Sequence, residues 1–308
     1  MTNLDIYKDI SARTGGAVMI GVVGPVRTGK SRFMEMLVIP NIEDEYARER
    51  ARDELPQSGS GRTIMTAEPK FVPEDAVRIR LGDDTSCMVR FVDCVGYMVQ
   101  GASGRFEDGS ERLVTTPWFD HEVTMTEAAE SGTRKVICDH STIGLVITTD
   151  GSICDIDREA YIEPERRVVS ELKSIGKPFV ILLNSAQPDS ERTIELERQL
   201  SAEYEAPCIR VNCQSLTQGD ICEIMRKVLG QFPLCEMSIR LPDWFCAVDC
   251  GNEMKSELYR QLIFASDCIK SVNDISQMLT RISELDIVDA AYIESSDMGS
   301  GTINIAID

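Results

Sequence analysis

The hydrophobic pattern between residues 18 and 232 alternates between short apolar runs and longer segments in which apolar residues recur every three or four positions. The short runs predict buried strands at residues 18–24, 143–150, 179–184 and 208–212. Helical spacing is found at residues 30–38, 126–140, 162–176, 191–204 and 219–232. This alternation predicts a mostly parallel sheet with helices on both faces, which binds ligands at the carboxyl ends of its strands.

A second pattern, early in the chain, places two apolar runs in succession without a helix between them. The runs at 77–82 and 87–93 are separated by two aspartates, which predicts a β-hairpin and therefore one antiparallel edge strand. The polar stretch that ends near residue 62 has no strong period, so no element is predicted there. The glycine-rich region 95–124 is predicted to be irregular.

The pattern changes at Pro233, which predicts a first domain of residues 1–233 and a small α+β domain of residues 234–308. The second domain is predicted to contain three strands, at residues 236–242, 287–294 and 302–307. One long helix at 254–282 carries an apolar stripe made of Leu258, Leu262, Ala265, Ile269, Val272, Ile275, Leu279 and Ile282. The stripe fits either a coiled-coil face for self-association or a core face. Its length of about four heptads favours the core.

The net charge of −19 argues against nucleic acid as a partner and against direct docking on an anionic membrane. The cysteines form no CxxC motif, and His121 and His140 are not in a pair with metal-ligand spacing, so neither a disulfide framework nor a zinc site is predicted. The first residues lack the apolar core of a signal peptide, and no apolar run approaches the roughly 18 residues of a spanning helix. We therefore expect a cytoplasmic protein without direct membrane insertion, or one held at a membrane through a partner.

Residues 24–31, GPVRTGKS, follow a buried strand and open a helix, which is the context of a P-loop. Glycines let the backbone wrap around phosphate, and successive N–H groups with the helix N-terminus supply positive potential. Lys30 is expected to bridge the β- and γ-phosphates, and Ser31 to place its hydroxyl on Mg²⁺. The predicted nucleotide-binding residues of the loop are Gly24, Pro25, Val26, Arg27, Thr28, Gly29, Lys30 and Ser31.

The apolar run at 87–93 ends in the motif Asp-Cys-Val-Gly at 93–96. Asp93 is expected to hold magnesium through a water, and the N–H of Gly96 to contact a γ-phosphate. A hydroxyl from residues 61–69 is expected to complete the magnesium coordination. Thr66 and Thr63 are the candidates, and Thr66 is preferred by analogy with switch loops, so the predicted metal set is Ser31, Thr66 and Asp93.

Residues 184–187 are Asn-Ser-Ala-Gln, where guanine-specific P-loop proteins have an NKxD motif. Without an acid to accept the guanine protons, discrimination in favour of GTP should collapse. ATP is therefore the predicted nucleotide, and Asn184 is expected to belong to its binding site.

Tyr97 occupies the position at which many GTPases orient water with Gln or His. A phenol with a pKa of about 10 accepts no proton near neutral pH. Arg27 is therefore proposed to neutralise charge during phosphoryl transfer, as an arginine finger does. The alternative is that Arg27 points outward and pairs with a carboxylate. The predicted catalytic residues are Lys30, Arg27, Thr66 and Asp93.

Several long segments together closely resemble the stage IV sporulation protein A family, the spore-coat morphogenetic ATPases of endospore-forming bacteria. They include IYKDISARTGG at 6–16, GVVGPVRTGKSRF at 21–33, VDCVGY at 92–97, TPWF at 116–119 and GKPFVILLNS at 176–185. The resemblance is dense from residue 1 to about 245 and weaker beyond it.

The resemblance implies a GTPase-like P-loop fold that has switched to ATP and Mg²⁺. It implies that hydrolysis drives self-association into a polymer, the basement layer of the spore coat, at the forespore surface in the mother cell. The implied partners are spore-coat morphogenetic proteins and a small amphipathic membrane peptide. The family's functional positions fall on Lys30, Asp93 and Thr66, while Ala67 replaces a second threonine that the family often has.

The family's chain continues through a further C-terminal domain, so this sequence is expected to be a truncated form or a short paralogue. Two alternatives to an assembly ATPase follow from the residues. One is a nucleotide-binding structural scaffold in which turnover is incidental, and the other is a GTP-specific switch protein.

Overall fold

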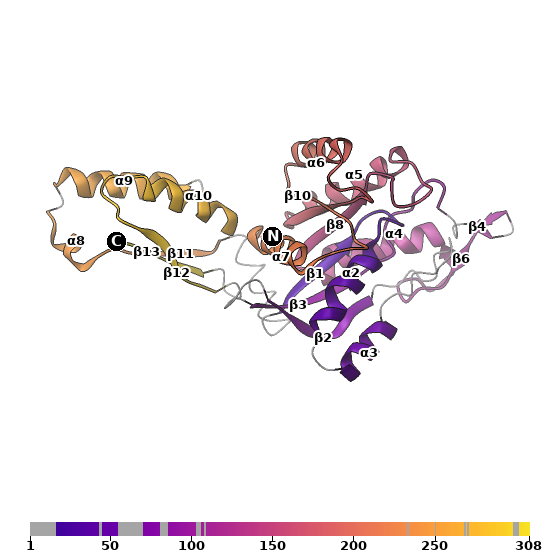
Figure 1. Ribbon diagram of the computed structural model, residues 1–308. Helices are drawn as coiled ribbons and strands as arrows, with labels where there is room; N and C mark the ends of the chain where they lie inside the picture. Colours follow the sequence, from indigo (N-terminus) through magenta and orange to yellow (C-terminus); the bar gives the residue numbers. More distant parts are fainter. Residues whose placement is uncertain are drawn as a thin grey trace. The chain divides into compact units, whose positions relative to one another are not determined.

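The computed structural model describes residues 17–42, 45–54, 70–80, 86–102, 106–107, 109–232, 234–249, 251–267, 269, 271–297 and 302–308. The chain divides into two compact units, of which the first ends at Val228 and the second begins at Leu229. Each unit has its own sheet (Figure 1). In the part of the chain that is described, no helix is long and apolar enough to cross a membrane.

The sheet of the first unit has six strands in the order β10-β9-β8-β1-β3-β2. The strands are β1 (Val18–Val23), β2 (Lys70–Arg80), β3 (Ser86–Asp93), β8 (Ile143–Thr149), β9 (Phe179–Asn184) and β10 (Cys208–Val211). All neighbouring pairs are parallel except β2 with β3. The predicted parallel sheet with one antiparallel edge strand is confirmed, although β2 begins at Lys70 rather than at residue 77.

Helices of the first unit follow the strands along the chain. They are α2 (Lys30–Val38), α3 (Glu45–Glu54), α4 (Met125–Lys135), α5 (Glu159–Ser174), α6 (Glu191–Tyr204) and α7 (Gln218–Gly230). A 3-10 turn, Ile39–Asn41, follows α2, and a π-helical turn, Val136–His140, follows α4. Every residue of β1, β8 and β9 is buried, as a sheet covered on both faces requires.

Two predictions for the first unit were wrong. The polar stretch after α2 contains the helix α3, whose sequence EYARERARDE is rich in strong helix formers but has no apolar stripe to reveal it. The region 95–124 contains short strands of two residues each, which are too short to show a period. They pair as β4 (Phe106–Glu107) with β5 (Ser110–Glu111), and β6 (Leu113–Val114) with β7 (Val123–Thr124).

The second unit has a three-stranded sheet in the order β11-β13-β12. Its elements are β11 (Glu236–Arg240), α8 (Asp243–Ala247), α9 (Glu253–Asp267), α10 (Val272–Ser283), β12 (Ala291–Asp297) and β13 (Thr302–Ile307). The single helix predicted at 254–282 is therefore two helices. The side chains of Ser271 and Asp274 form a reciprocal capping box that starts a new helix at α10.

The apolar stripe of these two helices faces the core of the second unit. Its buried members are Leu258, Leu262, Ala265, Ile275 and Ile282, and they share one cluster with Ile303, Ile305 and Ile307 of β13. The interpretation of the stripe as a core face is confirmed.

Candidate functional site

The loop between β1 and α2 requires glycine at two positions because other elements approach its backbone closely. Gly24 has φ 135°, and a Cβ built there would lie 2.3 Å from the carbonyl oxygen of Ile147 in β8. Gly29 has φ 94°, and its Cβ would lie 2.4 Å from the side-chain amide nitrogen of Asn184. Any larger residue would therefore push the loop away from β8 and β9.

Hydrogen bonds hold the loop in a compact turn above the sheet. Thr28 Oγ1 donates to the carbonyl oxygen of Pro25 at 3.0 Å. The N–H of Val26 donates to the carbonyl oxygen of Tyr97 at 2.9 Å, which joins the loop to the segment after β3. This is the strand-loop-helix geometry that cradles phosphate.

Lys30, at the start of α2, and Asp93, at the end of β3, are both buried and interact electrostatically. The Lys30 ammonium donates to the carbonyl oxygens of Pro25 at 2.6 Å and Gly24 at 3.3 Å. Burial lowers the pKa of Lys30, against the opposing effects of Cys94 and Asp93. A buried ammonium whose hydrogen bonds go to carbonyl oxygens is typical of a site built for a ligand of opposite charge.

Asp93 is the last residue of β3 and lies beside Lys30 and Ser31, the first two residues of α2. Burial raises the pKa of its carboxyl to about 6, while the charge of Lys30 and hydrogen bonds from the Cys94 N–H and from Ser31 act in the opposite direction. The structure thus brings together Lys30, Ser31 and Asp93, as the sequence predicted. A hydroxyl and a carboxylate are the hard oxygen donors that Mg²⁺ prefers, and the helix N-terminus with an ammonium fits phosphate.

Gly96 lies directly against the start of the P-loop. With φ 93°, a Cβ there would lie 2.1 Å from the carbonyl oxygen of Gly24 and 2.6 Å from the Lys30 ammonium nitrogen. Its N–H donates to Thr133 Oγ1 of α4 at 3.2 Å. The structure places Gly96 beside the P-loop, its contact with a γ-phosphate stays a prediction, and its partner Thr133 was not anticipated.

Asn184 links the P-loop to the carboxyl ends of β9 and β10. Its side-chain nitrogen donates to the carbonyl oxygen of Thr28 at 2.9 Å, and its side-chain oxygen accepts the N–H of Cys213 at 3.0 Å. The sequence predicted Asn184 in the site but did not identify Cys213. The only signal for Cys213 is its position just after the strand β10.

A carboxylate beside residues 184–187 is fully engaged by the chain itself. Asp150 accepts hydrogen bonds from Ser152 Oγ at 2.5 Å, Ser185 Oγ at 2.6 Å and Thr193 Oγ1 at 3.1 Å. Desolvation raises the pKa of Asp150, but the hydrogen bonds from Ser152, Ser185 and Thr193 outweigh it and leave the pKa below its usual value. Sequence reasoning missed this network, because its members lie in two separate loops and in α6.

Arg27 lies in the left-handed region of the backbone, with φ 63°, and is half-buried. Burial raises the pKa of the Tyr161 hydroxyl, and the nearby charge of Arg27 opposes that effect. Within the described ranges Arg27 forms no ion pair, so the outward-pointing alternative has no carboxylate partner there.

Tyr97 contributes its backbone to the site, while its side chain belongs to the core. The side chain is buried in one cluster with Val136 and Leu172, and the Arg167 guanidinium lies 4.6 Å from the ring centroid. Its hydroxyl lies near the Glu171 carboxylate without a hydrogen bond of normal geometry, and burial raises its pKa. This placement agrees with the expectation that Tyr97 does not orient water.

Thr66, its alternative Thr63 and the neighbouring Ala67 lie outside the described residues. Of the three predicted metal ligands, only Ser31 and Asp93 lie among the described residues.

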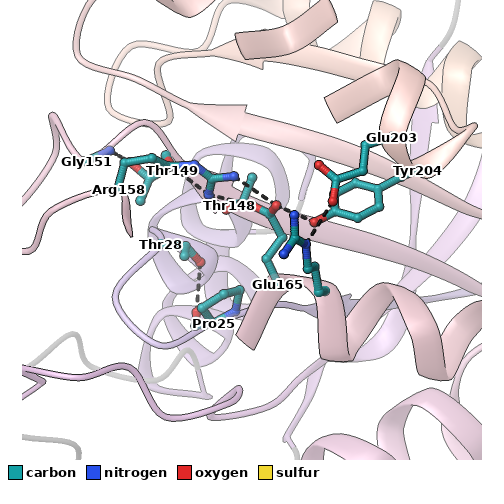
Figure 2. A network of polar contacts seen from close by, with 10 residues as sticks. Pro25, Thr28, Thr148, Thr149, Gly151, Arg158, Glu165, Glu203 and Tyr204 are labelled. Carbon is teal, nitrogen blue, oxygen red and sulfur yellow. Dashed lines mark hydrogen bonds and ion pairs between the residues drawn. The ribbon is translucent and has the colours of Figure 1, made fainter. Parts of the chain in front are cut away.

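A buried ion pair joins Arg158, the residue that precedes α5, to Glu165 within α5, and its carboxylate is also contacted from β8 and α6 (Figure 2). The two guanidinium nitrogens of Arg158 donate to the two oxygens of Glu165 at 2.6 and 2.9 Å. Thr148 of β8 and Tyr204 of α6 donate to the same carboxylate, the latter at 2.8 Å. Figure 2 also draws the P-loop bond between Thr28 and Pro25.

Comparison with known proteins agrees with the resemblance noted in the sequence. Residues 1–233 match the family model described as stage IV sporulation protein A, ATPase domain, and residues 234–308 match the middle domain of that family. Stage IV sporulation protein A of Clostridioides difficile (strain 630) is 49% identical over 307 residues, covering 98% of this chain and 62% of that protein.

Two further relatives carry the same name. The protein of Bacillus anthracis is 46% identical over 309 residues, and that of Bacillus subtilis (strain 168) is 42% identical over 309 residues. Each alignment covers 99% of this chain and 63% of the relative. The chain thus spans less than two thirds of the length of these relatives.

Proposed function

The chain belongs to the stage IV sporulation protein A family, and from this premise we propose that it hydrolyses ATP to drive its own assembly into the basement layer of the bacterial spore coat. The observation that carries the proposal is the convergence of Lys30, Ser31, Asp93 and Gly96 on one P-loop. This convergence lies within residues 1–233, which match an ATPase domain.

Each residue of this set has a role that follows from its chemistry. Lys30 would exchange its bonds to loop carbonyls for bonds to the β- and γ-phosphates. Ser31 would ligate Mg²⁺ directly, Asp93 would hold it through a water, and Thr66 would join when a triphosphate is bound. Bound Mg²⁺ would neutralise charge on the phosphate oxygens.

We expect ATP to be bound at least about tenfold more tightly than GTP, because Gln187 stands where the NKxD motif has the acid that pairs with guanine. Residues 184–187 carry no carboxylate, and that of Asp150 is engaged by Ser152, Ser185 and Thr193. Displacement of a fluorescent ATP analogue by each nucleotide measures this preference. The variant Gln187→Asp restores an acid at the NKxD position and should narrow the difference. Tighter binding of GTP than of ATP by the parent chain would contradict the proposal.

We expect Arg27→Ala to slow single-turnover ATP hydrolysis by ~10²-fold while ATP affinity stays within a few-fold. Arg27 lies in the P-loop without a carboxylate partner among the described residues, so its charge is available to the transferred phosphoryl group. The rate should also be independent of potassium, because a cis arginine replaces an ion.

The matched control for this experiment is Arg32→Ala. Arg32 lies in the first turn of α2, is exposed, and forms an ion pair with Glu35 at 2.6 Å. Loss of the Arg32 side chain should therefore leave the hydrolysis rate unchanged. A parental rate for Arg27→Ala, or a potassium requirement in the parent, would show that the missing catalytic group comes from elsewhere.

The location and partners proposed for this chain rest on the same family membership. We propose that it acts in the mother cell at the forespore surface, with spore-coat morphogenetic proteins and a small amphipathic membrane peptide as partners. No partner is proposed among nucleic acids, because the net charge of −19 opposes binding to phosphate backbones.

A further inference from the structure

We propose that Thr133 is a positioning residue that competes with the γ-phosphate for the N–H of Gly96, and so sets the preference of the site for ATP over ADP. The inference rests on the proposed ATP-binding function and adds to it a residue from α4. The geometry that supports it is the bond from the Gly96 N–H to Thr133 Oγ1, at 3.2 Å.

The hydroxyl of Thr133 is oriented so that it can only accept at Gly96. Its single proton is donated to the carbonyl oxygen of Ala129, one turn earlier in α4, at 2.7 Å. Its lone pairs therefore face the Gly96 N–H. Thr133 is fully buried, so water has no access to replace this acceptor.

Gly96 lies beside Lys30, the residue expected to bridge the β- and γ-phosphates, and its N–H is the donor expected to contact a γ-phosphate oxygen. A Cβ on Gly96 would lie 2.6 Å from the Lys30 ammonium nitrogen, so this residue and Lys30 share one small volume. A single N–H forms one strong hydrogen bond at a time. A triphosphate that takes this donor must displace Thr133, whereas a diphosphate leaves the bond in place.

The consequence for affinity follows from what happens to the donor when Thr133 is lost. With ADP bound, a buried Gly96 N–H that has lost the hydroxyl keeps only the weak acceptor sulfur of Cys94, while with ATP bound it is satisfied by phosphate. Removing the hydroxyl weakens this bond equally in the free protein and in the ADP complex, so the affinity for ADP should stay near its parental value while the affinity for ATP should rise. In the parent chain, Thr133 therefore reduces the preference of the site for ATP over its product, ADP.

The experiment measures the affinity of the full chain for ADP and for a non-hydrolysable ATP analogue, both with Mg²⁺, by isothermal titration calorimetry. Thr133→Val keeps the shape of the side chain, and we expect it to raise the ratio of analogue to ADP affinity by about tenfold. Thr133→Ser keeps the hydroxyl and should restore the parental ratio.

The matched control is Thr142→Val, at the opposite end of β1. Thr142 Oγ1 is buried and accepts the N–H of Met19 at 2.9 Å, so its loss removes a comparable bond far from the loop. It should lower stability without changing the ratio. If Thr133→Val binds both nucleotides with the parental ratio of analogue to ADP affinity, the inference about Thr133 is wrong and the proposed function is unaffected. If the parent binds neither nucleotide, the proposed function fails and the inference fails with it.

Discussion

Replacing Lys30 with methionine is expected to lower ATP turnover by about 10²–10³-fold, the loss that follows removal of one group that stabilises transition-state charge. The Lys30 ammonium is buried, and its present partners are the carbonyl oxygens of Pro25 and Gly24. Burial lowers its pKa, which means that the fold disfavours this charge rather than depending on it. Methionine retains most of the aliphatic length and removes the disfavoured ammonium, so the variant should fold.

Phosphate release measures the turnover of this variant, and sedimentation measures its assembly. If hydrolysis drives assembly, Lys30→Met should yield no ATP-dependent polymer. The matched control is Lys177→Met, because Lys177 is a second buried lysine whose ammonium donates to carbonyl oxygens, among them that of Ser141 at 2.5 Å. Its loss should reduce stability and leave the turnover of folded protein unchanged. Parental turnover in Lys30→Met would refute the P-loop assignment, and turnover without polymer in the parent would refute the coupling to assembly.

Replacing Glu165 with alanine is expected to lower the free energy of unfolding by about 3–5 kcal/mol, because it leaves a buried arginine without its counter-ion. The side chains of Arg158 and Glu165 are 9% and 1% exposed, and their two hydrogen bonds are bidentate. Thr148 and Tyr204 also lose an acceptor when the carboxylate is removed. Urea unfolding followed by circular dichroism measures the loss.

An exposed ion pair between α5 and α6 serves as the control. Arg166 and Glu203 lie 2.8 Å apart but are 60% and 42% exposed, so Glu203→Ala should cost less than about 1 kcal/mol. The double variant Arg158→Met with Glu165→Leu should recover part of the stability, since apolar side chains can replace a buried ion pair. A loss below about 1 kcal/mol for Glu165→Ala would show that Arg158 finds water or another acceptor.

The sequence by itself determined the sheet and the glycine-rich loop between β1 and α2. Strands and helices are recognisable because their apolar periods extend over many residues, and GPVRTGKS is recognisable because the backbone of a P-loop demands glycine at fixed positions. Lys30, Ser31 and Asp93 follow from the same local rule, since each lies where a strand meets a loop or a helix. The helix α3 was missed because it has good helix formers without an apolar stripe.

Only the tertiary structure decided which loops meet at the carboxyl edge of the sheet. The bond from Asn184 to Thr28 joins residues 156 positions apart, and that from Ser185 to Asp150 joins residues 35 apart. The same holds for Thr133, which reaches Gly96 across 37 positions, and for Tyr97, whose side chain lies in the core while its backbone touches the P-loop. No local pattern encodes such contacts, because the order of strands in the sheet sets which strand ends are neighbours, and the packing of each helix sets which of its side chains reach them.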